Sequence, residues 1–121
     1  MTYDNPLHIT YFLAAATLSS AADLLDIAGP KDMEGRLVAM SSIVTTGVTT
    51  TANAVDVGDG SDDDLYGTML VPISSADAVY NTFTNLTTDA NPIPKNTRVI
   101  LSTGGECAAG AANLWLTIAW F

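Results

Sequence analysis

The most concentrated set of possible metal-ligating residues is an acidic cluster in the middle of the chain. Its members are Asp56, Asp59, Asp62, Asp63 and Asp64. Carboxylates on a glycine-containing loop can wrap a calcium ion, which binds about six to eight oxygen atoms. The aspartate spacing differs from that of the standard calcium-binding loop, and the closing glutamate is missing. The pattern therefore favours a solvated strand connection over a cation site, and we expect no bound cofactor.

Nucleophilic catalysis has few candidate residues in this chain. A cysteine nucleophile needs a nearby base that lowers the pKa of its thiol, and a serine triad needs a histidine. The single cysteine, Cys107, is far in sequence from the single histidine, His8. Gly104 and Gly105 are not followed by the Gly-Lys-Ser/Thr of a phosphate loop. A hydrolase built on paired carboxylates stays a third interpretation, but the sequence cannot place two acidic residues across a groove. We therefore expect no enzyme. We interpret Cys107 as a small buried side chain.

Charge excludes two classes of partner. Only 14% of the 121 residues are charged, and the formal net charge is -9. The basic residues are Lys31, Arg36, Lys95 and Arg98. Binding to nucleic acid or to an anionic membrane requires a basic footprint, so neither is expected. Acidity instead favours solubility or docking onto a more basic partner.

No segment has the features of a membrane span or a leader peptide. The most apolar stretch, residues 9–18, is interrupted by Thr10 and Thr17 and is shorter than the roughly 18 residues of a span. The first basic residue is Lys31, so the positive start of a signal peptide is missing. We expect the chain to begin at or near Met1.

Alternation of apolar and polar residues predicts strands over most of the chain. Residues 1–6 are polar, end at Pro6 and are interpreted as an N-terminal arm. Strands are predicted at 7–17, 21–27, 34–45, 48–57, 65–73, 97–103 and 114–121. A helix is an open alternative at 11–18 and at 21–27. Gly47 is expected to end a strand, and loops are expected at 58–64, 91–96 and 104–113.

Residues 74–86 fit two patterns. Ala76, Val79, Tyr80 and Phe83 fall at helical spacing, and Ser74 with Asp77 resembles a weak capping box. The β-branched and aromatic composition instead favours a turn followed by a strand. We predict the strand, with a short helix near 74–84 as the open alternative.

About eight short strands with turn residues between them indicate an all-β protein. The pattern is that of an antiparallel β-sandwich of jelly-roll type, formed by a single domain over residues 7–121. The high hydrophobic fraction, 48%, combined with so few charges predicts that part of the surface is buried in an oligomer.

Aromatic residues near the two ends of the chain are candidates for that contact. Trp115 and Trp120 point to opposite faces of a strand, so one is expected in the core. The other, with Phe121, is expected to be covered by a neighbouring subunit. The candidate interface residues are Tyr3, Tyr11, Phe12, Trp120 and Phe121.

The order of these parts resembles the capsid decoration, or cement, proteins of tailed bacteriophages. Residues 35–38 (GRLV) match a strand of that family, and residues 48–55 (VTTTANAV) are similar to its ITTADAxV segment. Residues 67–74 (GTMLVPIS) resemble GTxTVxxS, and residues 91–105 (NPIPKNTRVILSTGG) resemble NxVxAGDxIxVxSxGG. The chain departs from the family at Asn96-Thr97, where Gly-Asp is usual, and in the acidic loop 59–64.

The resemblance implies a small β-sandwich with no active site. It implies a homotrimer on the outer surface of the virion capsid, made in the host cytoplasm, that binds the major capsid protein and bridges neighbouring capsid subunits. The alternative is a carbohydrate- or receptor-binding module of a head fibre or tail tip. That module would use Trp115 or Tyr66 as a stacking platform, together with the acidic loop.

Overall fold

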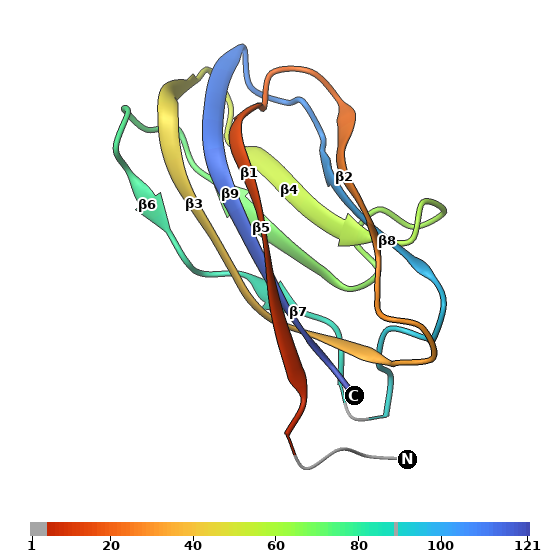
Figure 1. Ribbon diagram of the computed structural model, residues 1–121. Coiled ribbons are helices and arrows are strands. Elements are labelled where there is room, and N and C mark those ends of the chain that lie inside the picture. The colour runs from red at the N-terminus through yellow and green to blue at the C-terminus, as the bar shows by residue number, and fades with distance from the viewer. Residues whose placement is uncertain (1–4, 89) are drawn as a thin grey trace.

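The computed structural model describes residues 5–88 and 90–121, and every regular element in them is a β-strand (Figure 1). The strands are β1 (Leu7–Thr17), β2 (Ala22–Ala28), β3 (Gly35–Thr49), β4 (Asn53–Gly58), β5 (Gly67–Val71), β6 (Val79–Tyr80), β7 (Thr84–Asn85), β8 (Arg98–Thr103) and β9 (Ala109–Trp120). The described residues include no helix that is long and apolar enough to cross a membrane. Of the expected arm, residues 1–4 lie outside the described residues.

The strands form two antiparallel sheets that face each other as a sandwich (Figure 1). One sheet has the order β1-β9-β3-β6, and the other has the order β2-β8-β4-β5-β7. The pairs β4–β5, β3–β6, β2–β8 and β1–β9 are nested around the β4–β5 hairpin. This nesting is the jelly-roll arrangement, and it confirms the predicted all-β sandwich. The two-residue β7 is an addition at the far edge of the five-stranded sheet.

The strand pattern of the sequence produces the core directly. In β9, Leu114, Leu116 and Ile118 point inward and are at most 2% exposed, whereas the residues between them are half-buried on the outer face. This is the period of two that a strand imposes. The opposite sheet contributes the buried side chains Val55, Val57, Met69, Val99 and Leu101.

The indole of Trp120 closes one end of the sandwich. It is 1% exposed, and its Nε1 donates a hydrogen bond to the Tyr11 hydroxyl at 3.2 Å. Gly29 and Gly35 both lie against its ring. A Cβ on Gly35 would come within 2.7 Å of Cζ3, and a Cβ on Gly29 would overlap the ring outright. Only a residue without a side chain leaves room for the Trp120 ring at these two positions.

Several of the expected strand boundaries are wrong. β3 continues through Gly47 to Thr49, so the strand expected at 48–57 begins only at Asn53, as β4. β9 begins at Ala109, inside the expected 104–113 turn. Gly47 does not stop the strand, because it lies where another segment comes close: a Cβ there would be 3.1 Å from the carbonyl oxygen of Ser74. Val48 and Ser74 exchange backbone hydrogen bonds at 2.8 and 3.1 Å beside it.

The short helix considered near residues 74–84 does not form. The backbone there is held to β3 instead, since Val44 N–H donates to the Ala78 carbonyl and Asp77 N–H donates to the Val44 carbonyl. Asp77 adopts a left-handed conformation with φ 73°, which ends any helical turn. A turn followed by the two-residue strand β6 results, as the preferred prediction stated.

The two tryptophans give a matched test of this core. Replacing Trp120 with Ala is expected to lower the free energy of unfolding by about 3–5 kcal/mol, the usual cost of deleting a buried aromatic side chain. Replacing Trp115, which is half-buried on the outer face, is expected to cost about 1 kcal/mol through its contact with Phe12. Urea titration of both variants measures the difference, and equal losses would show that Trp120 does not hold the core.

Candidate functional site on the outer face of the four-stranded sheet

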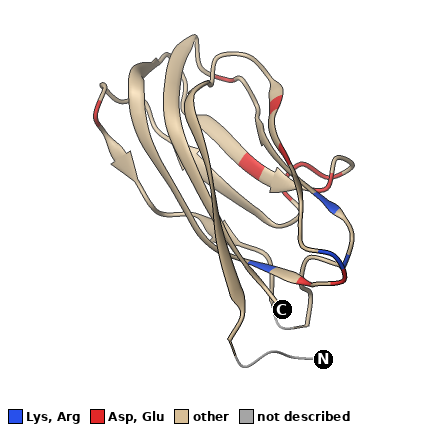
Figure 2. Ribbon diagram, viewed as in Figure 1, with Lys and Arg blue, Asp and Glu red and all other residues tan. Residues whose placement is uncertain are grey.

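The outer face of the sheet β1-β9-β3-β6 is almost free of charge. Arg36 is the only Lys, Arg, Asp or Glu residue in its four strands. In Figure 2 these strands are nearly all tan, whereas charged residues gather on the other sheet and at the end of the sandwich. The register sets Thr10 beside Thr117 and sets Phe12 and Ser41 on either side of Trp115. The face thus presents aromatic, aliphatic and hydroxyl groups together.

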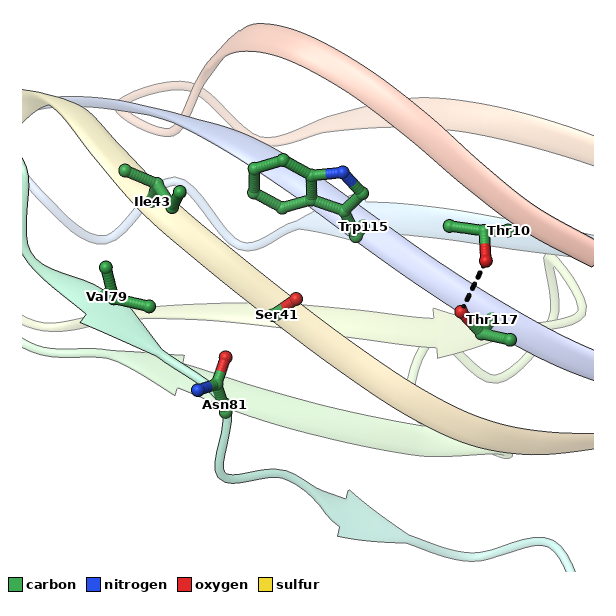
Figure 3. Close-up of a pocket in the computed structure, with 7 residues that line it drawn as sticks. All are labelled: Thr10, Ser41, Ile43, Val79, Asn81, Trp115 and Thr117. Atoms are coloured by element: carbon green, nitrogen blue, oxygen red, sulfur yellow. Dashed lines mark hydrogen bonds between the residues drawn. The ribbon is translucent and has the colours of Figure 1, made fainter.

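A shallow hollow of about 410 Å³ lies on this face. Its lining residues come from β1, β3, β9 and the segment around β6: Thr10, Ser41, Ile43, Val79, Asn81, Trp115 and Thr117. Figure 3 shows Trp115 between Ile43 and Val79 on one side and the Thr10–Thr117 pair on the other. The two threonine hydroxyls are hydrogen-bonded at 2.8 Å. None of the seven side chains is ionised at neutral pH, so the hollow suits an uncharged surface or ligand.

An aromatic pair borders the hollow. The rings of Phe12 and Trp115 have centroids 5.0 Å apart and planes tilted by 38°. Phe12 is 51% exposed, and Val79 across the hollow is 55% exposed. Exposed aromatic and aliphatic side chains at the centre of a neutral face are typical of protein interfaces. The same groups can also stack against a sugar ring.

The other sheet has an acidic outer face. Asp23 and Asp56 lie on either side of Ser102 in the register, and Asp26 lies beside Ile100. Arg98 forms an ion pair with Asp26 through Nε at 3.0 Å, but both side chains are more than half exposed. Such exposed pairs contribute little to stability.

The cation site that was the less favoured interpretation of the loop after β4 is not assembled among the described residues. Among the described residues no three His, Cys, Asp or Glu side chains are grouped to hold a metal ion. The carboxylate of Asp59 instead accepts hydrogen bonds from the backbone N–H groups of Ser61 and Asp62, at 2.9 and 3.0 Å. These bonds lower the pKa of Asp59. A hydrogen bond with Asp64 raises the pKa of Asp62.

Asp56 has a different environment from the rest of the acidic cluster. It projects from β4 and accepts a hydrogen bond from the Thr68 hydroxyl at 2.6 Å. Burial raises the pKa of its carboxyl group, and the nearby charges of Asp64, Glu106 and Asp63 add to that rise. The Thr68 hydrogen bond opposes it. Ionisation of Asp56 therefore lowers the free energy of unfolding.

The predicted interface residues fall in three different places. Phe12 lies on the neutral face beside Trp115. Tyr11 and Trp120 point inward and are hydrogen-bonded to each other, so Trp120 belongs to the core and cannot cover a neighbouring subunit. Phe121 is half-buried beneath the guanidinium of Arg36, 4.5 Å from its ring centroid. Tyr3 lies outside the described residues.

Other sequence candidates are separated from this face. Tyr66 is 4% exposed, so it cannot serve as a stacking platform, and burial raises the pKa of its hydroxyl. His8 pairs with Ala119 at one end of β9, whereas Cys107 is buried just before the other end. The structure therefore places His8 and Cys107 at opposite ends of the four-stranded sheet.

Several lining residues were missed by the sequence interpretation. The β3–β9 pairing brings Ile43 beside Trp115, and the β3–β6 pairing then adds Val79 and Asn81 from a segment far away in sequence. The one available signal was the outward register of Thr10, Phe12, Trp115 and Thr117 on predicted strands. No protein-family model matches the chain, and no curated protein sequence matches it.

The acidic cluster yields a pH-dependent prediction. Because the pKa of Asp56 is raised in the folded state, its contribution to stability is present below the unfolded value of 3.8 and is lost as pH rises through the folded value. Asp56→Asn keeps an acceptor for Thr68 and removes the charge. We expect its melting temperature at pH 7 to rise by about 2–5 °C, with the gain shrinking toward pH 4.

Asp59→Asn is the matched control with the opposite sign. The lowered pKa of Asp59 means that its ionised form stabilises the fold above pH 3.8. Asp59→Asn is therefore expected to lower the melting temperature at pH 7 and to approach the parent protein in acid. Melting curves from pH 3 to 8 that shifted both variants in one direction would contradict this assignment.

Proposed function

We propose that the chain is a structural decoration protein of a phage capsid, which binds the outside of the shell and bridges neighbouring major capsid subunits. The observation that carries the proposal is the segregation of charge between the two faces of the sandwich. A chain with a net charge of -9 keeps one whole sheet nearly neutral and leaves Phe12 and Val79 half exposed there. Burial against another protein explains such a face.

The two faces have different roles under this proposal. The neutral face packs on the shell, where its aromatic and aliphatic side chains are removed from water. The acidic face points to the solvent and keeps the decorated particle soluble. Binding of this kind depends on apolar contact, so it depends only weakly on salt, in contrast to docking by acidic residues on a basic patch.

The order of strand segments supports the capsid assignment over other assembly roles. The segments that resemble decoration proteins, residues 35–38, 48–55 and 67–74, form or border β3, β4 and β5. Three copies around a local three-fold axis are the arrangement that this resemblance implies. Sedimentation of the free protein, whose monomer mass is 12.6 kDa, tests that trimer directly.

Two exposed aliphatic residues provide a matched test of the docking face. Val79 on the neutral face is 55% exposed, and Leu70 on the outer face of β5 is 57% exposed. Val79→Asp would bury an unpaired charge in the proposed contact, so we expect at least about a tenfold loss of binding to capsids stripped of the protein. Leu70→Asp should bind within about twofold of the parent.

Bound copies are counted by gel densitometry after the capsids are pelleted at low and high salt. Loss of binding by Leu70→Asp but not by Val79→Asp would overturn the assignment of the docking face. Failure of the parent protein to bind the shell at stoichiometric copy number would overturn the decoration role itself.

The hollow favours one second candidate, a module that binds neutral carbohydrate. Trp115 offers a ring face, and Thr10, Ser41, Asn81 and Thr117 offer uncharged hydrogen-bonding groups around it. A receptor module would bind neutral glycans and occur in few copies per particle. We then expect a saturable change in tryptophan emission on adding the glycan, abolished by Trp115→Ala and retained by Phe121→Ala. No binding across a panel of neutral glycans would exclude this candidate.

A further inference from the structure

The four sheet edges of the sandwich are unequally protected. An exposed edge strand can pair with another chain through its free backbone groups, and proteins usually block such edges with charges, short strands or bulges. β6 and β7 are edges of only two residues each. β2 carries Asp23 and Asp26 and has a register shift between Asp23 and Leu25. These three edges are blocked.

β1 is the exception. It has eleven residues, forms the edge of the four-stranded sheet, and among the described residues pairs only with β9. From Leu7 to Leu13 the register with β9 is continuous, and the first shift comes only between Leu13 and Ala16. This stretch contains no Lys, Arg, Asp, Glu or Pro. Seven consecutive residues thus present an unblocked edge.

The inward side chains of β1 are also incompletely covered. Leu7 is 49% exposed, although Trp120, its partner on β9 and on the same face, is 1% exposed. Ile9, Tyr11 and Leu13 are half-buried, whereas their partners Ile118, Leu116 and Leu114 are fully buried. The opposite sheet therefore does not extend far enough to cover β1. A strand added beside β1 would cover this apolar row.

We infer that β1 pairs antiparallel with β1 of a second copy, across a two-fold axis, and joins two four-stranded sheets into one. The charge distribution selects a second copy as the occupant. The chain repels itself wherever aspartates face aspartates, as at the β2 edge, but β1 brings no acidic residue to the contact. The pairing is also self-complementary, because it sets the half-buried inward row of one copy against the same row of the other.

The pairing has a definite geometry. Residues opposite each other in an antiparallel pair point to the same face, and between Leu7 and Leu13 of β1 the inward residues are odd-numbered and the outward ones even-numbered. An inward residue of one copy must therefore lie opposite an inward residue of the other, so the two residue numbers are both odd or both even. The two-fold axis then passes beside a single residue of β1, which lies opposite the same residue of the second copy. Each chain has one such edge, so this contact is additional to any three-fold arrangement.

A single-cysteine scan tests this geometry. Positions 8 to 13 are changed to Cys one at a time in a Cys107→Ala background, and each variant is oxidised. We expect one position to form an intermolecular disulfide in high yield. The variants two residues away should not, because their sulfur atoms would be separated by about 13 Å along the strand. Oxidation of the Cys107→Ala protein itself is the control.

A charge placed on the edge gives an independent readout. Thr10 lies at the middle of the continuous stretch from Leu7 to Leu13, so Thr10→Lys would set two like charges within the paired segment. We expect it to weaken self-association at least tenfold by analytical ultracentrifugation. Thr45→Lys adds the same charge at an exposed residue of β3, away from the β1 edge, and should associate like the parent. This comparison separates the loss of the edge contact from a general effect of charge.

Each result decides the inference. One cross-linking maximum, together with weaker association of Thr10→Lys, supports it. A protein that stays monomeric at high micromolar concentration, an oligomer with no cross-linking position in β1, or an edge that accepts only a strand of a different protein would overturn it. The inference does not rest on the capsid role, because a chain that pairs through β1 but does not bind capsids would leave it standing.

Discussion

The packing of the Trp120 indole between Gly29 and Gly35 is the constraint on which the rest of the sandwich depends. Gly29 follows β2 of one sheet, Gly35 begins β3 of the other, and Trp120 ends β9. One indole therefore fixes how closely the two sheets approach at this end. Glu34 and Phe121 exchange two backbone hydrogen bonds of 2.9 Å beside it, which fastens the end of β9 to the start of β3. The registers of β1 and β3 on β9 both begin at this residue.

That anchored register decides which side chains reach the solvent. Once Trp120 points inward, the period of two sends Trp115 and Thr117 outward and sets them beside Phe12 and Thr10. The composition of the outer face is then a consequence of the core. A shift of one residue would exchange the two faces, placing Leu114, Leu116 and Ile118 in water. Burial of these side chains holds the neutral face in place.

The strands with clear alternation were predictable from sequence, and the segments fixed by distant contacts were not. β1, β8 and the second half of β9 follow from local pattern alone. Gly47 has the local features of a strand end, but the approach of Ser74 lets β3 continue through it. Residues 74–86 form only two very short strands, because their hydrogen bonds go to β3, to β5 and to the loop before β5 rather than along the segment. No local pattern encodes such distant partners.

The candidate site also combines features that local sequence predicts with features that only distant contacts determine. The outward positions of Phe12 and Trp115 are local facts about strands, but the hollow between them and Val79 exists only because β6 pairs with β3. Trp120 is in phase with the buried row Leu114, Leu116 and Ile118, whereas the glycines that make room for its ring come from segments far away in sequence. The aspartates of residues 56–64 suggested ligands, yet hydrogen bonds within the loop direct Asp59 toward its own backbone.

Charge placement links the neutral face to the free edge. The outward aspartates of β2 and β4 and those of the loop at 59–64 lie on or beside the five-stranded sheet, where their like charges oppose pairing of the β2 edge or its face with a second copy. The four-stranded sheet has no such protection on its face or on β1, although its edge is the longer one. A sequence that needed only solubility would spread its charge over both sheets, since a bare apolar edge is an aggregation hazard. Under the proposed function, leaving one sheet nearly uncharged while the chain carries a net charge of -9 would favour contact with other protein at that sheet. We infer that the uneven distribution directs association: aspartates block the β2 edge and one face, the two-residue length of β6 and β7 blocks two further edges, and the β1 edge and the neutral face stay open.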